Sequence, residues 1–350
     1  MRRALPSLAA LPASVLLLTS CAQPADQAVE EQTPIGEGAV REQLSIVTGG
    51  TTGVYFQIGG VLSTIIGDDL EGQSASAETT GASVENLRLL GNGEADIAIV
   101  QGDAAGQAFE GVAEFENSGV ESYALGVLYP NVFHTVTLAG TAEEEGLECF
   151  RDVLGTRYSV GAPGSGNAAT TSAVFEALEM SMGDIEIEQL GYAETDTALR
   201  NDQLDAGSWV VGEGHAGLAE LATTEDVALV GMCDDERSAI TAGSSSYTEH
   251  TIPGGTYEGV DEDVETIAVW NSLVVSGDFN EDQAYDITAA LFANVDAVLD
   301  AYAPAEEYLV PEAILNSPVP VHPGAARFYE EQGVELPDEL VADTGADTQG

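Results

Sequence analysis

Two short glycine-rich segments have the residue types that a backbone site for an anion requires. Residues 48–53 (TGGTTG) follow a short apolar strand at 44–47 and precede an apolar helical pattern that begins at Val54. Residues 161–167 (GAPGSGN) occupy the same position between a strand and a helix. Glycine lets backbone N–H groups approach a ligand closely, and a helix N-terminus carries about half a positive charge. Both segments therefore favour a negatively charged guest, although a turn needed only for packing is the alternative reading.

The candidate ligand contacts lie in and beside these two loops. They are Thr48, Gly49, Thr51, Tyr55, Gly164, Ser165 and Gly166. The threonine hydroxyls add donors to the backbone N–H groups, whereas Tyr55 either borders the cleft or joins the core. A serine between glycines also suggests a hydrolase. The nucleophile elbow G-x-S-x-G fails here, because Pro163 and Asn167 occupy its outer positions around Ser165.

Polar residues at the ends of further strands add candidates. Ser83 and Asn86 begin a helical pattern, and Gln101 and Asp103 follow the apolar strand DIAIV. Ligands of open parallel sheets bind at the carboxyl ends of the strands, so these side chains are expected at the same crevice. Gln101 can donate and accept, and Asp103 can bind an ammonium group; helix capping is the alternative for Ser83 and Asp103. Trp209 ends another strand and either covers the ligand or fills the core.

The charge of the chain indicates a saline environment. Its 350 residues include 60 Asp and Glu against 9 Arg and no Lys, which gives a formal net charge of -51. Salt screens such self-repulsion, so we expect a halophilic protein. The acids are spread along a chain that is 44% hydrophobic, which argues against a disordered acidic tail. We expect no nucleic-acid partner for this surface.

The N-terminus predicts export. Arg2 and Arg3 precede an apolar run, and a small residue stands before Cys21. This pattern resembles a bacterial lipoprotein signal, in which residues 1–20 are removed and Cys21 carries the lipid. We therefore expect an extracytoplasmic protein that a lipid holds at the cell membrane; an ordinary signal with a chance cysteine is the alternative. Residues 21–43 are polar and lack periodicity, which is typical of a flexible acidic tether.

The remaining cysteines and the histidines bear on disulfides and metals. With Cys21 lipidated, Cys149 and Cys233 remain, and outside the cytoplasm such a pair favours a disulfide. Their separation in sequence leaves open whether they meet. The four histidines show no close metal-ligand spacing, so we expect no metal site.

Alternating strands and helices predict an α/β fold with mostly parallel sheets flanked by helices. The length of the chain favours two lobes, each with such a sheet and with the ligand cleft between them. A late apolar run, TIAVWNSLVVSGD, can return the chain to the first lobe. We therefore predict lobe I at about 44–130 and 255–345, and lobe II at about 131–254.

Six segments in order resemble the signature blocks of one family. They are TGGTTGVYFQIGG, GASVENLRLL, ADIAIVQGDAAGQAFEG, VGAPGSGN, QLDAG and VPVHPGAARFYEEQG. Together they look like the TAXI family, the solute-binding subunits of tripartite ATP-independent periplasmic (TRAP) transporters. The resemblance implies a two-lobed, type II periplasmic-binding-protein-like fold whose hinge closes on a small organic acid. Glutamate-like amino acids and dicarboxylates are the implied ligands, and TRAP-type membrane permease subunits are the implied partners. Asn167 departs from the threonine often found there.

The sequence bears on three classes of function. A transport-associated binding protein agrees with export, the lipid anchor, the two lobes and the ordered blocks. An enzyme would need a nucleophile with a base or a metal cluster, and the sequence shows neither. A secreted ligand-sensing receptor with the same lobes is the alternative. We expect a monomer that uses no cofactor and is not an enzyme.

Overall fold

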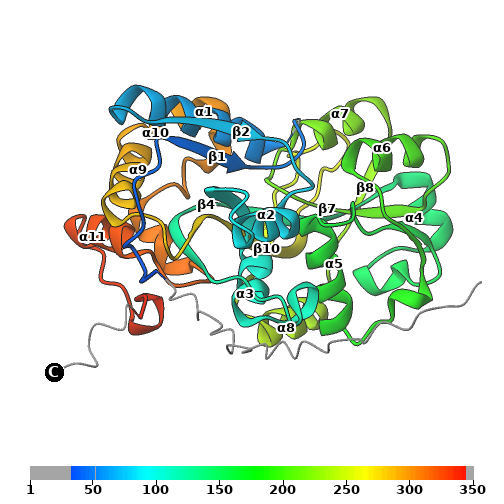
Figure 1. Cartoon of the computed structure of the whole chain (residues 1–350). Coiled ribbons are helices and arrows are strands. Elements are labelled where there is room, and N and C mark those ends of the chain that lie inside the picture. Colours follow the sequence, from blue (N-terminus) through cyan, green and yellow to red (C-terminus); the bar gives the residue numbers. More distant parts are fainter. Residues whose placement is uncertain (1–32, 52, 344–350) are drawn as a thin grey trace, which may run out of the picture. The chain divides into compact units, whose positions relative to one another are not determined.

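The computed structural model describes residues 33–51 and 53–343 (Figure 1). The predicted signal peptide and Cys21 lie outside these residues. The strands form a mixed sheet with the order β2-β1-β3-β10-β4-β7-β5-β6, in which β8 also pairs with β4 and β9 with β10. Two long strands, β4 (Ser122–Leu138) and β10 (Val264–Ser276), lie antiparallel at its middle.

On one side of the long strands, three parallel strands alternate with helices. The strands are β1 (Gln43–Val47), β2 (Ser74–Glu78) and β3 (Ile97–Gln101), and the helices are α1 (Val54–Asp69), α2 (Ser83–Gly91) and α3 (Gly102–Glu110). Strand β1 pairs in parallel with both β2 and β3. Each strand of this half is thus followed by a helix, as the sequence pattern predicts.

The other half repeats this arrangement between β4 and β10. Its strands are β5 (Arg157–Ser159), β6 (Glu186–Glu188), β7 (Ala206–Val211), β8 (Val227–Val230) and β9 (Tyr247–Ile252). Its helices are α4 (Ala139–Glu145), α5 (Gly166–Ala177), α6 (Tyr192–Arg200), α7 (Ala216–Thr224) and α8 (Asp234–Gly243). Strand β5 pairs in parallel with β6 and β7.

After β10 the chain returns to the first half, where three further helices pack. They are α9 (Glu281–Ala293), α10 (Val295–Ala301) and α11 (Pro323–Glu331). The large apolar core takes its members from 44–129 and 273–340 together with Ala169, and two smaller cores use 132–269. The lobe boundaries predicted from the sequence stay a prediction, because β4 and β10 run through both halves.

A proline marks the point where the long strands pass from one half to the other. Pro130 of β4 pairs with Trp270 of β10, and the register shifts between Trp270 and Ser272. Proline cannot donate a ladder hydrogen bond, so it is found at such irregular positions in sheets. Tyr129 and Asn131, on either side of Pro130, lie two residues apart and therefore point to the same face.

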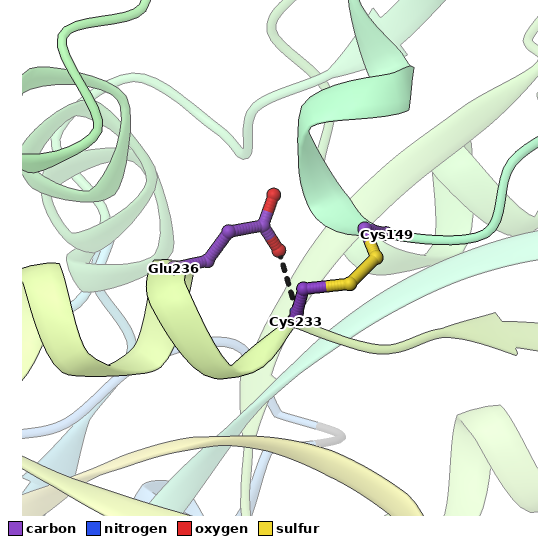
Figure 2. A group of neighbouring side chains, drawn as sticks. All are labelled: Cys149, Cys233 and Glu236. Atoms are coloured by element: carbon purple, nitrogen blue, oxygen red, sulfur yellow. Dashed lines mark hydrogen bonds between the residues drawn. A yellow bond between two sulfur atoms is a disulfide. The ribbon is translucent and has the colours of Figure 1, made fainter.

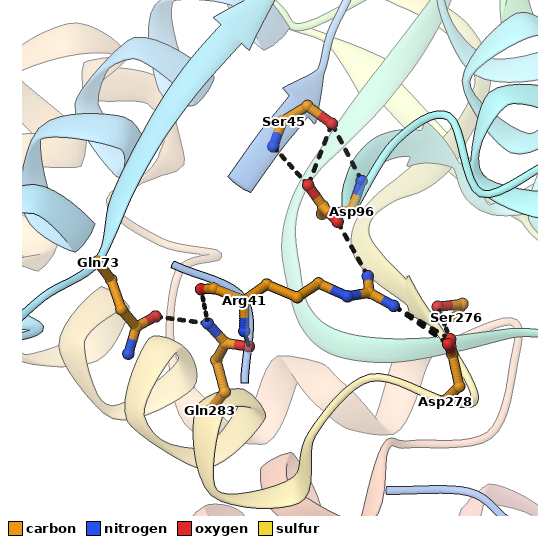
Figure 3. Close-up of polar contacts among 7 residues, drawn as sticks. All are labelled: Arg41, Ser45, Gln73, Asp96, Ser276, Asp278 and Gln283. Carbon is orange, nitrogen blue, oxygen red and sulfur yellow. Dashed lines mark hydrogen bonds and ion pairs between the residues drawn. The ribbon is translucent and has the colours of Figure 1, made fainter. Parts of the chain in front are cut away.

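The last part of the predicted tether packs on the body. The backbone N–H of Arg41 donates to Gln283, and the Gln283 amide donates back to the Arg41 carbonyl (Figure 3). The Arg41 guanidinium contacts Asp96 at 3.0 Å and Asp278 at 3.2 Å. The Gly36 N–H also donates to the Gly277 carbonyl, and the Gly36 carbonyl accepts from the N–H of Glu281, the first residue of α9. The segment from about Gly36 is therefore held in place, although we expected tether up to residue 43.

The structure joins Cys149 and Cys233 by a disulfide (Figure 2). Each cysteine directly precedes a helix, and Glu236 in the first turn of α8 lies beside them. The buried Glu236 carboxylate accepts hydrogen bonds from the backbone N–H groups of Phe150, Arg151 and Cys233, at 3.2, 2.8 and 2.7 Å. The carboxylate thereby ties two helix starts together next to the covalent link, because anions are stabilised at helix N-termini.

His134 of β4 is buried in the second half and uses both ring nitrogens. Its Nδ1 lies 2.9 Å from the Val132 carbonyl and 3.1 Å from the Trp209 carbonyl, and its Nε2 lies 3.0 Å from the Tyr257 hydroxyl. Carbonyls only accept, so Nδ1 carries the proton and Nε2 accepts from Tyr257. Burial lowers the pKa of His134 to about 4.

We expect acid to destabilise the wild-type protein relative to a His134→Gln variant. In the unfolded chain the imidazole takes a proton below about pH 6.5, whereas in the folded protein it resists protonation down to about pH 4. Stability due to His134 is therefore lost as the pH falls through this window, by about 3 kcal/mol in total. Urea unfolding of both proteins from neutral pH to about pH 3.5 measures the effect. A pH-independent difference between them would contradict it.

No helix among the described residues is both long enough and apolar enough to cross a bilayer.

Candidate functional site

A cavity of about 300 Å³ lies between the two halves of the protein. Residues from α1, from the turn before α2, and from β3 and β4 line it on one side, and residues from α5, α6, β7 and the residue before α7 line it on the other. Tyr129 and Asn131 of β4 reach it beside the proline irregularity. The cavity therefore lies where the two halves meet the long strands that they share.

Six helices begin at this cavity. The residue that precedes each of α1, α2, α3, α5, α6 and α7 lines it, and these residues are Gly53, Ala82, Gln101, Ser165, Gly191 and His215. Among the six, Ser165 is the one whose side chain caps its own helix, by accepting from the Ala168 N–H at 3.1 Å. A helix N-terminus has backbone N–H groups without intrahelical partners and a positive partial charge. The backbone N–H groups of these helix starts therefore give the cavity a positive electrostatic potential without any charged side chain.

Most of these helix starts share one local sequence pattern. At five of the six starts a strand ends, a short segment containing glycine follows, and the helix begins; α3 follows β3 directly, and Ser165 alone among the six caps its helix with a side chain. Ala82, before α2, has a φ of 78°, which is unusual for a residue with a side chain. Such a conformation costs about 1 kcal/mol or more and is concentrated at functional sites.

None of the described residues that line the cavity is an arginine. Each of the seven arginines within the described residues forms at least one ion pair with a carboxylate elsewhere. Arg88 on α2 pairs with Glu114 at 3.3 Å. Positive charge for a ligand therefore has to come from the helix starts.

The side chains of the lining are mostly apolar or neutral. Burial raises the pKa of Tyr55, Tyr129 and Tyr192, so these hydroxyls stay protonated at neutral pH. Burial lowers the pKa of His215 to about 4, which keeps its ring uncharged. Glu194, at the start of α6, is the acidic residue of the lining and is exposed. The interior of the cavity therefore presents dipoles and apolar groups rather than charges.

A comparison with protein families decides the relationship of the chain. The model of the NMT1-like family matches residues 46–333. The chain belongs to this family.

Several solved structures are similar to this NMT1-like chain. A protein of Bordetella bronchiseptica RB50 has 16% identity and a TM-score of 0.50, with 86% of this chain and 85% of that chain covered. The periplasmic aliphatic sulphonate binding protein SsuA of Escherichia coli has 13% identity, a TM-score of 0.45 and coverages of 86% and 96%. PhnD1 of Prochlorococcus marinus, solved with methylphosphonate, has 10% identity, a TM-score of 0.48 and coverages of 75% and 90%. The predicted fold class, lobes of mostly parallel sheet flanked by helices, is confirmed.

Five of the twelve predicted contacts line the cavity of this NMT1-like protein. They are Gly49, Tyr55, Gln101, Ser165 and Gly166. Gly166 packs so closely that an added Cβ would lie 2.6 Å from the Gln101 amide carbon. The predicted loops 48–53 and 161–167 thus both reach the cavity.

Four other predicted contacts do not line the cavity; three of them support the loops beside it, and one is exposed. The Thr48 hydroxyl donates to the Glu78 carbonyl at 2.7 Å, and Thr51 is exposed. The Ser83 hydroxyl accepts from the Gln101 N–H at 3.0 Å. The Asn86 amide donates to the Thr48 and Ile99 carbonyls at 2.6 and 2.9 Å. The Thr48, Ser83 and Asn86 side chains hold the turn and the neighbouring strand ends together, and none of the four predicted contacts lines the cavity.

The last three have structural partners. Asp103 is buried and accepts from Thr170, Tyr247 and the Ala104 N–H, so it connects the two halves rather than facing the cavity. Burial raises the pKa of Asp103. The Gly164 carbonyl accepts from the Glu85 N–H at 3.2 Å. Trp209 is 1% exposed and packs against Tyr192.

Sequence reasoning missed several lining residues. Gly191 and Tyr192 repeat the pattern of a strand followed by glycine and a helix, and this signal was present in the sequence. Asn131 gave only a weak signal, a polar residue after proline inside a long apolar strand. His215 is one of the four histidines, and the sequence around it indicated no role. Asn167 fixes the start of α5 to β7, donating to the Ser208 carbonyl at 2.8 Å and accepting from the Val210 N–H at 3.2 Å.

One group of potential metal ligands occurs in the part of the chain that the structure describes. It consists of Cys149, Cys233 and Glu236. The two sulfur atoms are bonded to each other, and Glu236 accepts backbone hydrogen bonds, so the disulfide explains why these residues are close.

Proposed function

We propose that this NMT1-like protein is an extracytoplasmic solute-binding protein. It captures a small organic acid between its lobes by hinge closure and delivers the acid to a membrane permease. The observation that supports this best is the convergence of six helix starts on one cavity without a cationic side chain in its lining. Partial charges of about +0.5 per helix suit an anionic group and repel a cation.

The finer assignment comes from the six ordered sequence blocks. They favour a TRAP-type permease as partner, membership of the TAXI group, and a glutamate-like amino acid or a dicarboxylate as ligand. SsuA and PhnD1, named for or solved with a sulfonate and a phosphonate, add two further anion classes to test. Cys21 is the proposed lipid anchor, and the net charge of -51 is the basis for proposing a halophilic protein.

We expect at least one organic acid to raise the melting temperature of the purified protein in high salt. A ligand that binds only the folded state stabilises it by about 2.7 kcal/mol at a hundredfold excess over its Kd, which corresponds to several degrees. The panel contains amino acids, dicarboxylates, monocarboxylates, sulfonates and phosphonates, with sugars and polyamines as controls. Stabilisation by sugars or polyamines alone would overturn the proposal.

The transport role needs a separate measurement. Cells that lack the gene should lose uptake of the radiolabelled acid, and the returned gene should restore it. Normal uptake without the gene, beside a neighbouring gene for a sensor kinase, would favour the ligand-sensing receptor instead.

A further inference from the structure

His215 is a buried polar residue of the cavity wall that lacks a partner. It precedes α7, is 5% exposed and lines the cavity. Neither its Nδ1 nor its Nε2 has a hydrogen-bond partner among the described residues. Its ring packs at 5.7 Å from Tyr192 and at 5.9 Å from Trp209, whose indole Nε1 is also without a partner there.

Each of the other three histidines has at least one hydrogen-bond partner for its side chain among the described residues, although the Nε2 of His322 also lacks one there; the His322 Nδ1 accepts from the Gly324 N–H at 3.3 Å. Both ring nitrogens of His134 have partners, and His250 lies 2.9 Å from Glu213. Buried polar groups in proteins nearly always have a hydrogen-bond partner, and leaving one unsatisfied costs about 1–3 kcal/mol. An imidazole in a cavity wall therefore points to a partner that arrives from the cavity. A neutral histidine offers one donor and one acceptor to that partner.

The position of His215 suits an oxygen acceptor. It stands at the start of α7 and contacts Tyr192, the first residue of α6, and neither helix has a side-chain cap. The backbone N–H groups of two helix starts and the imidazole N–H therefore lie in one part of the wall. The opposite side of the cavity has the starts of α1 and α2, and Leu190, Val210 and Val211 supply apolar surface.

An ammonium group has no comparable partner in the cavity. Asp103, considered from the sequence as an ammonium ligand, does not line the cavity, and its oxygens accept from Thr170, Tyr247 and Ala104. Glu194 is the carboxylate of the lining, and it is exposed. Positive helix starts further disfavour a cation.

We propose that His215 contacts the ligand and determines its class: an organic acid with a second oxygen acceptor, a carboxylate or a carbonyl, and without an ammonium group. The first carboxylate binds at the starts of α1 and α5, and the second acceptor binds at His215. This inference rests on the proposed function, because it refines the acid that the same cavity takes.

Matched acids test the inference. Isothermal titration calorimetry in high salt compares pentanoate, 4-oxopentanoate, glutarate and glutamate, and then heptanoate with pimelate. In each length class we expect the acid with a second acceptor to bind at least tenfold more tightly than the plain monocarboxylate, and glutarate at least tenfold more tightly than glutamate. His215→Phe keeps an aromatic ring. In this variant the preference for the acid with a second acceptor over the plain monocarboxylate should fall below twofold, while the affinity for the monocarboxylate changes less than threefold.

Two further variants separate the outcomes. His215→Gln keeps a donor and should retain part of the preference, and it replaces His215→Phe if that variant does not fold. His250→Phe, outside this cavity, should behave as wild type. If the acids bind but their relative affinities are the same in wild type and in the His215 variants, the inference is overturned and the proposed function stays intact. A protein that binds none of the acids in the wider panel would overturn both.

Discussion

Replacement of both Cys149 and Cys233 by serine is expected to lower the free energy of unfolding by about 4 kcal/mol. The disulfide closes a loop of 84 residues that contains β5 to β8. The chain-entropy argument relates the stabilisation to the length of the closed loop, because the linked unfolded chain has fewer conformations. Urea unfolding of the variant and the wild type gives the two values.

Reductant provides the matched control for this prediction. It should destabilise the wild-type protein and leave the double serine variant unchanged. Thiol titration of the unfolded, unreduced protein should find neither Cys149 nor Cys233 free. A variant within about 1 kcal/mol of the wild type would contradict the argument, because it would mean that the loop is already restrained in the unfolded state.

Much of the fold follows from patterns that operate over short distances. Short strands of three to five residues, glycine turns and helical periodicity occur within windows of about 20 residues, and they locate β1 with α1 and β5 with α5. The same windows identify which loops reach the cavity, since helix starts follow the carboxyl ends of parallel strands. This pattern is enough to predict Gly49 and Gly166 as residues of the site.

The roles of individual polar side chains depend on partners that are distant in the sequence. The sequence alone therefore could not predict these roles. Asp103 meets Thr170 and Tyr247, which are 67 and 144 residues away. Nothing near Asp103 in the sequence distinguishes this role from an ammonium site or a helix cap. Thr48 was similarly ambiguous, because its hydroxyl donates to a strand neighbour 30 residues away rather than to a ligand.

The polar N-terminal segment shows the same limit. It lacks apolar periodicity, so the sequence predicts a tether up to residue 43. The order of the residues from about Gly36 comes from backbone hydrogen bonds and from Arg41, which pairs with Asp96 and Asp278 in two other parts of the chain. Sequence patterns predict which segments bury apolar side chains. They do not predict a segment that is held by hydrogen bonds and ion pairs.

Gly166 is the position where a small change should have the greatest effect on binding. It is the first residue of α5, and an added Cβ would lie 2.6 Å from the Gln101 amide and 2.7 Å from the Ser83 hydroxyl oxygen. Both neighbours are held. Gln101 donates to Thr170 at 2.7 Å, and its backbone N–H donates to Ser83 at 3.0 Å. A methyl group at Gly166 therefore forces the two halves apart instead of displacing a free side chain.

We expect Gly166→Ala to bind the acid identified by thermal shift at least about 100-fold more weakly, a loss of about 2.7 kcal/mol. Separation of α5 from β3 and α2 moves two helix starts away from the ligand, and their attraction for an anion acts only over the first turn. Calorimetry measures the affinity, and small-angle scattering of the unliganded protein should show a larger radius of gyration than wild type. Gly60→Ala is the matched control, because a Cβ there meets no atom within 4 Å. Wild-type affinity in Gly166→Ala would mean that the acid binds without this contact between the halves, and closure around the cavity would then have no role in holding it.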